Sequence, residues 1–279
     1  MTPTIIRSLP EMLTISRQWE NGKKIGFIPT MGYLHEGHIS LVRAAERECD
    51  IIVVSIYVNP SQFGPNEDFT RYPRDLDHDL SLLSSCRVDY VFTPHDEDMY
   101  PKDHKTWIEV EDLSNVLCGK SRPGHFRGVS TVVSKLMNLV KPTYMYMGMK
   151  DYQQIVVLEK MITDLHISTV IRRCPIVRET DGLAMSSRNR YLSPDERQRA
   201  LSLSRSLQAV QRYVSEGRNE LEKAKLLIRG MISEAEGRID YIEIVDSVTL
   251  QPVERVSHGN RALVAVYFGK TRLIDNMEL

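Results

Sequence analysis

The stretch Thr30-Met31-Gly32-Tyr33-Leu34-His35-Glu36-Gly37-His38 lies between a strand-like run at residues 24–28 and a helix-like run at residues 39–45. It is therefore expected to be a turn that leads from a β-strand into an α-helix. A helix N-terminus has unpaired N–H groups and a partial positive charge, and both suit an anion such as phosphate. Gly32 and Gly37 would let the backbone approach such a ligand closely. The sequence therefore predicts an anion-binding turn here.

His35 and His38 are three residues apart, so in a first helical turn both imidazoles would face the same way. Imidazole N–H groups can donate hydrogen bonds to phosphate oxygens as negative charge develops on them in a transition state. The simpler alternative is a glycine-rich turn whose histidines only satisfy local backbone groups. Because two histidines flank a glycine at this crossing, we favour the functional interpretation.

The order of the predicted elements around this turn indicates an α/β fold. Residues 51–58 are a continuous β-branched run, which is typical of a parallel strand covered on both faces. Together with the strand at 24–28 and a helix at 39–48, this run makes a βαβ unit. Further strands are predicted at residues 89–93, 106–110, 143–147 and 168–174, and further helices within 4–21 and at 76–83, 129–140 and 152–165. We expect a Rossmann-like parallel sheet with helices on both faces.

The last third of the chain has a different pattern. Ser193-Pro194-Asp195-Glu196 combines a serine cap, a proline at the first helical position and a glutamate three residues after the cap. Helices are predicted from there to about residue 216 and from 219 to 235, and alternating antiparallel strands at 239–245, 262–268 and 271–274. We therefore expect a smaller α+β C-terminal domain, which follows a hinge-like loop at residues 175–192.

Composition bounds the class of protein. The chain has 279 residues, of which 42% are hydrophobic and 26% charged, as in ordinary globular proteins. A net charge of −1 gives no basic field for nucleic acid, and no apolar run approaches the roughly 18 residues of a membrane helix. The N-terminus lacks the layout of a signal peptide, and the four scattered cysteines contain no C-x-x-C pair. We expect a cytoplasmic protein with neither nucleic acid nor membrane as a partner.

Three polar segments follow predicted parallel strands, and ligands bind beyond the carboxyl ends of such strands. They are Met31–His38, Asn59–Gln62 and Gly148–Gln154. Lys150 could neutralise a phosphate, and Asp151 could accept hydrogen bonds from ribose hydroxyls, although a Lys–Asp neighbour pair is usually a weak surface pair. A glutamine amide both donates and accepts, so Gln62 and Gln154 are candidates for holding a small hydroxy acid. Taken singly, either glutamine is more often an ordinary loop residue.

The segment His35-Glu36-Gly37-His38 resembles the HIGH signature of nucleotidylyltransferases and class I aminoacyl-tRNA synthetases. With its flanks, Pro29–Leu41, it resembles the pantothenate synthetase (pantoate–β-alanine ligase) family in particular. The segment Ala184–Asn189 resembles the KMSKS loop of the superfamily, but Ala184 replaces the first lysine and Arg188 brings the cation one place later. A Ser-Ser-Arg-Asn form is what the pantothenate synthetases show. The resemblance continues through residues 58–62, 72–74, 124–128 and 148–154.

The resemblance implies an ATP-dependent, AMP-forming ligase that joins (R)-pantoate to β-alanine through an enzyme-bound pantoyl adenylate and releases pyrophosphate. It implies a homodimer and a need for Mg²⁺, whose ligands stay open; Asp77 and Asp79 are outer-shell candidates. Residues 1–176 would form the ATP- and pantoate-binding domain. Residues 177–279 would form the smaller domain, which carries the hinge and a mobile Ser-Ser-Arg loop that closes over a triphosphate.

The resemblance also assigns residues to roles. His38 is implied as a proton donor, with His35 and Lys150 as further catalytic residues. The implied ATP contacts are Met31, Gly32, Tyr33, Leu34, His35, Glu36, Gly37, His38, Gly148, Met149, Lys150, Asp151, Val177, Met185, Ser186, Ser187 and Arg188. The implied substrate contacts are Gln62 and Gln154 for pantoate, with Gln62 also near β-alanine, and Asn59 and Tyr72.

Three other functions share parts of this pattern. A nucleotidylyltransferase of the same superfamily would keep the nucleotide on its product. A catalytically silent nucleotide-binding module would bind ATP without turning it over. An aminoacyl-tRNA synthetase fits least well, because the sequence has no separate RNA-binding domain and no basic stretch.

Overall fold

The computed structural model describes residues 3–19, 22–65 and 67–279, and its contacts divide the chain into two compact units. Unit 1 comprises Met1–Asn115, Arg122–Met149 and Gln154–Pro175. Unit 2 comprises Val116–Ser121, Lys150–Gln153 and Ile176–Leu279. Two short segments of unit 2 are therefore inserted in the sequence of unit 1.

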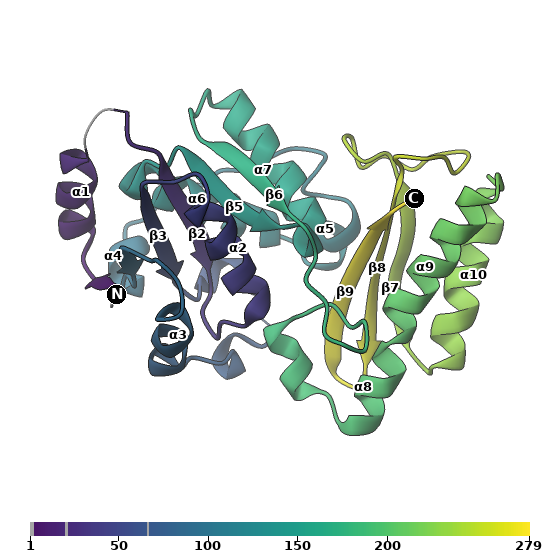
Figure 1. Ribbon diagram of the computed structural model, residues 1–279. Helices are drawn as coiled ribbons and strands as arrows, with labels where there is room; N and C mark the ends of the chain where they lie inside the picture. The colour runs from purple at the N-terminus through teal and green to yellow at the C-terminus, as the bar shows by residue number, and fades with distance from the viewer. Residues whose placement is uncertain (1–2, 20–21, 66) are drawn as a thin grey trace. The chain divides into compact units, whose positions relative to one another are not determined.

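The core of unit 1 is a six-stranded parallel sheet (Figure 1). Its strands, in spatial order, are β1 (Thr4–Ile6), β4 (Tyr90–Phe92), β3 (Ile51–Ile56), β2 (Ile25–Thr30), β5 (Tyr144–Gly148) and β6 (Val170–Cys174). β2 has β3, the next strand in the sequence, on one side and β5 on its other side. The order therefore reverses between β2 and β5, where doubly wound folds bind ligands beyond the carboxyl ends of the strands.

Helices cover both faces of this sheet. On one face lie α2 (Glu36–Glu46) and α3 (Leu76–Leu83), whose apolar residues pack with Ile28, Ile52 and Val91 of the strands. The other helices of unit 1 are α1 (Leu9–Gln18), α6 (His125–Val140), α7 (Tyr152–Asp164) and the short α4 (Asp96–Met99). α6 contacts α1, and Ser134 of α6 donates to Met161 of α7, so these three helices form the layer on the other face. Short 3₁₀ turns follow β3 (η1, Pro60–Gln62, and η2, Phe69–Arg71) and β5 (η3, Met149–Asp151).

Unit 2 is an α+β structure with a three-stranded antiparallel sheet. The strand order is β7 (Arg238–Val245), β8 (Arg261–Phe268) and β9 (Thr271–Glu278). Helices α9 (Ser202–Ser215) and α10 (Leu221–Glu234) cover one face, where Leu207 and Ile228 pack with Val264 (Figure 1). The unit also holds η4 (Ser187–Tyr191), α8 (Pro194–Ala200) and the five-residue α5 (Leu117–Ser121). The predicted fold class is thus confirmed.

Several predicted boundaries were wrong. Residues 106–110, predicted as a strand, belong to no helix or strand of the described chain. The strand β1 was not predicted, since three residues are too short to show a period. The predicted helix at 193–216 is interrupted at Leu201, whose N–H bonds to the carbonyl of Gln198 and so tightens one turn. α2 begins at Glu36 rather than Ile39, because His35 caps it, and β9 extends to Glu278.

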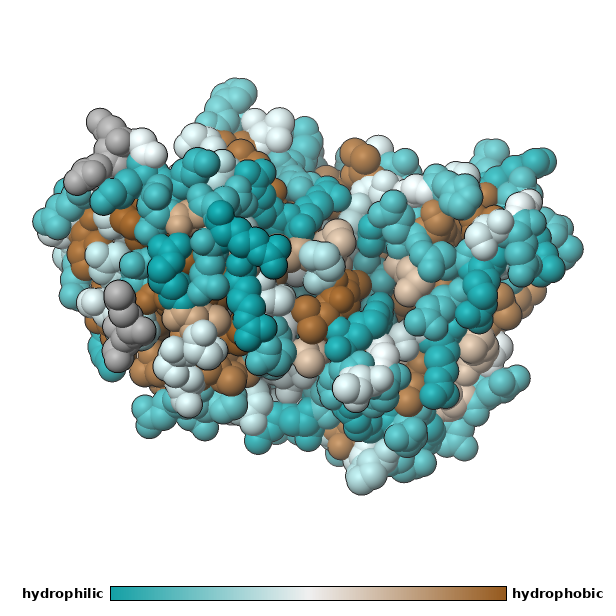
Figure 2. All heavy atoms as spheres, viewed as in Figure 1, coloured by the Kyte–Doolittle hydropathy of each residue, from teal (hydrophilic) through white to brown (hydrophobic). Residues whose placement is uncertain are grey.

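The surfaces of both units are mainly hydrophilic on the face drawn in Figure 2, with smaller hydrophobic patches between charged residues. None of the helices in the described residues combines the length and the apolar character that crossing a bilayer needs.

Candidate active site

The turn after β2 has a left-handed backbone. Gly32 has φ 82° and Tyr33 has φ 50°, and a Cβ added to Gly32 would lie 2.9 Å from Cγ2 of Ile56. Asp79 of α3 holds this conformation, because its carboxylate accepts from the N–H of Tyr33 at 2.9 Å and of Leu34 at 2.6 Å. The glycine is therefore needed both for its dihedral angle and for space.

His35 and His38 close the N-terminus of α2 as a capping box. Nδ1 of His35 accepts from the N–H of Gly37 at 3.1 Å, and Nδ1 of His38 accepts from the N–H of His35 at 3.2 Å. The two ring centroids are 4.1 Å apart. A nitrogen that accepts a hydrogen bond carries no hydrogen, so each neutral ring holds its proton on Nε2. Capping of the helix and hydrogen bonding to a phosphate are thus compatible, because capping uses Nδ1 of each ring and donation to a phosphate would use Nε2.

Most backbone donors of this turn, which were predicted to be unpaired, have acceptors. The N–H of Gly32 donates to Oγ1 of Thr30, and the following donors are taken by Asp79 and by the two imidazoles. The turn satisfies these groups internally because a buried N–H without an acceptor costs free energy. An anion near α2 would therefore be met by imidazole Nε2–H groups and by the helix dipole.

Asp79 was considered only as an outer metal ligand, yet the structure gives it a role in shaping the turn. Its side chain is almost completely buried. Burial raises the pKa of this carboxyl, although the hydrogen bonds from Leu34 and Tyr33 act in the opposite direction. The cost of burying the charge is thus partly offset by the two backbone donors.

We expect Asp79→Asn to lower the free energy of unfolding by about 1–3 kcal/mol, because the amide nitrogen would face a buried N–H that loses its acceptor. Urea unfolding of the variant measures this change. Asp77→Asn is the matched control, since Asp77 lies on the same helix and is more exposed. Equal stability of the two variants would contradict the role assigned to Asp79.

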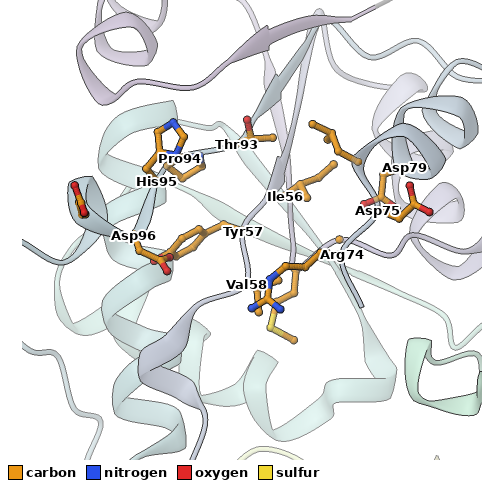
Figure 3. A pocket seen from close by; sticks show the side chains of 14 residues that line it. Ile56, Tyr57, Val58, Arg74, Asp75, Asp79, Thr93, Pro94, His95 and Asp96 are labelled. Atoms are coloured by element: carbon orange, nitrogen blue, oxygen red, sulfur yellow. The ribbon is translucent and has the colours of Figure 1, made fainter. Parts of the chain in front are cut away.

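A pocket of about 630 Å³ opens beside this turn at the carboxyl ends of β3 and β4. Met31 and Gly32 line it, and Figure 3 shows Asp79 on one side and Tyr57 beside Asp96 on the opposite side. Burial and then the Asp96 carboxylate raise the pKa of the Tyr57 hydroxyl, so it stays protonated at neutral pH. Two of the predicted ATP contacts therefore border an open cavity of unit 1.

Gln62 is fixed by its neighbours at the end of β3. Asn59 caps η1 and donates from Nδ2 to Oε1 of Gln62 at 3.1 Å and to the carbonyl of Gly128 at 3.2 Å. Nε2 of Gln62 lies 2.9 Å from Sδ of Met31, to which it donates. The structure thus brings the predicted substrate residues Asn59 and Gln62 together, and it brings Gln62 into contact with the predicted ATP residue Met31.

The backbone of Gln62 is held from the start of α6. Its carbonyl accepts from Nη2 of Arg122 at 3.2 Å and from Nδ1 of His125 at 2.9 Å. Because Arg122 can only donate, its 3.0 Å contact with Nε2 of His125 assigns the ring proton to Nδ1. Glu67 binds the same guanidinium at 2.6 and 2.7 Å. This network fixes the backbone at Gln62.

The remaining predicted residues of unit 1 lie at the same edge or in its loops. Gly148 is the last residue of β5 and Met149 the first of η3, and Gln154 is half-buried in the first turn of α7. No hydrogen bond joins Gln62 to Gln154 in the described part of the chain. Tyr72 is buried, with its ring edge-on to Phe63 at 5.8 Å.

In unit 2, Val177 and the Ser-Ser-Arg segment belong to one hairpin. The N–H of Met185 donates to the carbonyl of Val177 at 3.0 Å, and Arg178 pairs with Ala184 around Gly182. The hairpin therefore places the predicted ATP contacts Val177 and Met185 side by side.

The Ser-Ser-Arg segment is tied to unit 2 rather than left as a free loop. Oγ of Ser186 caps η4 by accepting from the N–H of Arg188 at 3.3 Å, and Ser187 and Arg188 are half-buried. Nδ2 of Asn189 donates to Glu179 at 2.8 Å and to the carbonyl of Ala184 at 3.1 Å. Any movement of these residues would therefore involve the hairpin as well.

Lys150 lies against this segment. Lys150, Ser186 and Asn189 line the same small pocket of unit 2. The carbonyl of Lys150 accepts from Nδ2 of Asn276 in β9 at 2.9 Å, and its ammonium lies 3.8 Å from the exposed carboxylate of Asp151. The predicted cation and one predicted serine are thus neighbours.

Sequence reasoning missed several residues that shape the site. Arg122, His125 and Gly128 stand in the segment Arg122-Pro123-Gly124-His125-Phe126-Arg127-Gly128, of which only residues 124–128 were used, to support the resemblance. Its basic side chains and its two glycines, at the start of a helix, were the available signal. Asn276 gave no such signal, because it lies in an ordinary strand.

Among the described residues, no group of three His, Cys, Asp or Glu side chains could hold a metal ion by itself. Mg²⁺ at nucleotide sites keeps several waters and is bound largely through phosphates.

The reversal of strand order beside β2, with the His35–His38 box at the same edge, defines an α/β protein whose ligand site lies beyond the carboxyl ends of its parallel strands. Residues 4–278 match the family model for pantoate-beta-alanine ligase, and the chain belongs to this family.

Named relatives agree with this membership over the whole chain. Pantothenate synthetases of Thermosipho melanesiensis and Thermotoga petrophila are 55% and 54% identical, over 98% of this chain and of each relative. The crystal structure of pantothenate synthetase from Thermus thermophilus is 43% identical and has a TM-score of 0.94 over 99% of both chains. A pantoate-beta-alanine ligase of Francisella tularensis, solved with beta-gamma ATP and beta-alanine, is 37% identical with a TM-score of 0.83, covering 99% of this chain and 97% of that one.

Proposed function

We propose that this chain joins (R)-pantoate to β-alanine, with ATP as co-substrate, and so forms pantothenate, AMP and pyrophosphate. It is an ATP-dependent, AMP-forming acid–amine ligase of pantothenate biosynthesis. The observation that carries this proposal is the 55% identity to a pantothenate synthetase over 98% of both chains. The relatives do not favour a nucleotidylyltransferase that keeps the nucleotide on its product.

The reaction has two steps. An oxygen of the pantoate carboxylate attacks the α-phosphorus of ATP, and the bond from phosphorus to pyrophosphate breaks. The β-alanine amine then attacks the acyl carbon of pantoyl adenylate, AMP leaves with the bonding electrons, and the amine gives up one proton. The first step depends mainly on positioning and on stabilising charge at the phosphates.

The two histidines of the His35–His38 box donate hydrogen bonds that stabilise the negative charge on the phosphate oxygens. His38 acts as the proton donor through Nε2, and His35 assists it, because the Nδ1 atoms of both rings are engaged in capping. Lys150 neutralises phosphate charge, and Asp151 accepts from the ribose hydroxyls. The other proposed ATP contacts are Met31, Gly32, Tyr33, Leu34, Glu36, Gly37, Gly148, Met149, Val177, Met185, Ser186, Ser187 and Arg188.

Pantoate is held by the amides of Gln62 and Gln154, with Asn59 and Tyr72 beside them. Support for Gln62 comes from its fixed position, since Asn59 donates to its amide oxygen, its amide nitrogen donates to Met31, and Arg122 and His125 donate to its backbone carbonyl. An amide that is already oriented loses little entropy when it binds a small ligand. Gln62 also lies near the β-alanine site in this proposal.

Gly128→Ala tests the placing of Gln62. A Cβ at this position would lie 2.4 Å from the Ser61 carbonyl oxygen and 2.8 Å from the Gln62 nitrogen, which are backbone atoms. We expect a loss of about 1–3 kcal/mol in the free energy of unfolding, together with a raised KM for pantoate and a nearly unchanged KM for ATP.

Urea unfolding and steady-state kinetics measure these effects. The matched control is Gly230→Ala in α10, where an added Cβ meets nothing within 4 Å. A wild-type KM for pantoate in Gly128→Ala would contradict the support assigned to Gln62.

Four further properties belong to the proposal. Mg²⁺ accompanies ATP and neutralises phosphate charge, without a dedicated cage of protein ligands. The enzyme is a homodimer that works in the cytoplasm. Residues 1–176 form the ATP- and pantoate-binding domain, and residues 177–279 form the smaller domain with the hinge and the Ser-Ser-Arg segment.

One assay tests the function. The protein is incubated with ATP, Mg²⁺, pantoate and β-alanine, and pyrophosphate, AMP and pantothenate are followed. We expect pyrophosphate with pantoate alone, and AMP with pantothenate only after β-alanine is added. Pyrophosphate release without any AMP in the presence of β-alanine would exclude the ligase. No turnover of ATP at all would leave a silent nucleotide-binding module.

A further inference from the structure

Two consecutive polar residues, Asp275 and Asn276, are buried in β9, which is an edge strand of the unit 2 sheet. Each residue is only 2% exposed. Successive side chains of a strand point to opposite faces, so the two residues serve different faces of the sheet. Because a buried polar group costs free energy unless it is hydrogen-bonded, the partners of these two residues indicate their role.

The carboxylate of Asp275 holds the hairpin of residues 177–185. Its two oxygens accept from Nη1 and Nη2 of Arg178 at 2.7 and 3.0 Å. Nη1 of Arg178 also donates to the carbonyl of Gly182 at 3.1 Å, at the turn of the same hairpin. Arg178 directly follows the proposed ATP contact Val177. Because a two-pronged pair fixes the plane of the guanidinium, Asp275 fixes the hairpin that carries this contact.

The amide of Asn276 holds the segment that carries Lys150. Its Nδ2 donates to the backbone carbonyl of Lys150 at 2.9 Å, and its Oδ1 accepts from Nη1 of Arg261 at 2.8 Å. Arg261 is buried as well, and its guanidinium lies 3.9 Å from the centroid of the Tyr152 ring, two residues after Lys150. The Lys150 segment is therefore fixed to the sheet at two points.

Asp275 and Asn276 are also joined to each other. The N–H of Asn276 donates to Oδ1 of Asp275 at 2.8 Å, and the same oxygen accepts from Arg178. Lys150, Ser186 and Asp275 line one small pocket of unit 2. We propose that Asp275 and Asn276 are positioning residues for the nucleotide, because they set the distance between the Lys150 segment and the hairpin of residues 177–185.

The polar character of this pair supports positioning rather than simple stabilisation. Apolar side chains of similar volume often stabilise a buried site as well as an ion pair does, but they cannot hold a guanidinium and a backbone carbonyl from two segments. A displacement of about 1 Å at groups that meet a transition state can cost roughly 10²-fold in rate. This inference rests on the proposed function, since it needs both segments as ATP contacts, and it adds two residues that act through them.

Titration calorimetry with α,β-methylene-ATP and Mg²⁺ tests the proposal, because the bridge between the α- and β-phosphorus of this analogue is not cleaved. We expect Asn276→Ala and Asp275→Asn each to raise the Kd of the analogue roughly 10-fold, the scale of coupling between contacting residues. The KM for pantoate at saturating ATP should stay nearly unchanged. Such a selective effect on the nucleotide would not follow from a general loss of stability.

Glu243→Gln is the matched control. Glu243 of β7 pairs with Nζ of Lys225 in α10 at 2.6 Å, so the substitution breaks a partly buried ion pair on the same sheet. This pair joins a strand to a helix rather than to a segment proposed to bind ATP. We expect Glu243→Gln to lower the melting temperature and to leave the Kd of the analogue unchanged.

A double-mutant cycle tests whether Asn276 acts through Lys150. If it does, Asn276→Ala adds little to the loss that Lys150→Ala already causes, whereas independent effects would multiply. Arg178→Lys tests the other half of the proposal if Asp275→Asn does not fold. It keeps a positive charge beside Asp275 but loses the two-pronged contact, so it should show the same selective loss of affinity for the analogue.

Three results would each overturn the proposal: wild-type affinity for the analogue in folded Asn276→Ala and Arg178→Lys, an equal loss in Glu243→Gln, or independent effects in the cycle. Circular dichroism establishes that each variant is folded. A wild type that binds the analogue but forms no pantothenate would count against the proposed function and not against this inference. A wild type that does not bind the analogue would overturn both.

Discussion

His38→Ala should slow formation of the adenylate roughly 10²–10³-fold, the scale measured when a single transition-state donor is removed. The physical reason is that Nε2–H of His38 donates to phosphate oxygens as their charge increases, and alanine has no donor. Pyrophosphate release in a single turnover, with ATP and pantoate but no β-alanine, measures the effect. Near-normal release would contradict the role of His38.

The structure adds a control, because His38 also caps α2 through Nδ1. The Oδ1 atom of asparagine takes nearly the same place as Nδ1 of histidine, so His38→Asn keeps the acceptor for the His35 N–H and loses the Nε2 donor. We expect His38→Asn to have near wild-type stability and the same slow adenylation as His38→Ala. If His38→Asn instead regained most of the rate, capping rather than donation would be the contribution of His38.

Lys150→Ala should lower kcat/KM for ATP roughly 10- to 100-fold, which corresponds to about 1.5–3 kcal/mol for a hydrogen bond to a charged group. Lys150 lines the same pocket as Ser186, and its side chain is only partly exposed. Steady-state kinetics with ATP varied at saturating pantoate and β-alanine measure the loss.

Lys160→Ala is the control for Lys150, because Lys160 lies in α7, the helix that directly follows Lys150, is exposed and pairs with Asp164. Its kinetics should equal those of the wild type. Unchanged kinetics in Lys150→Ala as well would show that Lys150 and Asp151 form an ordinary surface pair worth little.

The type and order of most strands and helices could be predicted from the sequence because the signals for these elements are local. The continuous β-branched run 51–58 identified β3, and the helix α3 was predicted at Leu76–Leu83 and found there. Residues 106–110 have the composition of a strand but form none in the described chain, because a strand also needs a pairing partner, which the local sequence pattern does not identify. The start of α2 was misplaced because its cap is a histidine, which lies outside the usual set of capping residues.

The site was predictable in position but not in its internal contacts. Parallel strands end at one edge, so the segments after β2, β3 and β5 could be grouped from the sequence. The hydrogen bond from the Tyr33 N–H to the Asp79 carboxylate joins residues 46 positions apart, so no local sequence pattern indicates it. The ring nitrogens of His35 and His38 that serve as caps, and the close approach of Gly128 to Ser61, likewise depend on neighbours that only the folded chain brings together.

The two inserted segments, Val116–Ser121 and Lys150–Gln153, make the chain pass between the units five times, since six segments alternate. They are also joined to each other: the side chain of Gln153 accepts from the Cys118 N–H at 3.0 Å and donates to the Val116 carbonyl at 2.8 Å. A proteolytic cut or a truncation near residue 176 would therefore not release an intact N-terminal piece. Such a fragment would keep both inserted segments but would lose the contacts of Cys118 with Tyr241 and of Lys150 with Asn276. If the two fragments are coexpressed, we therefore expect them to be recovered together as a noncovalent complex, or not at all.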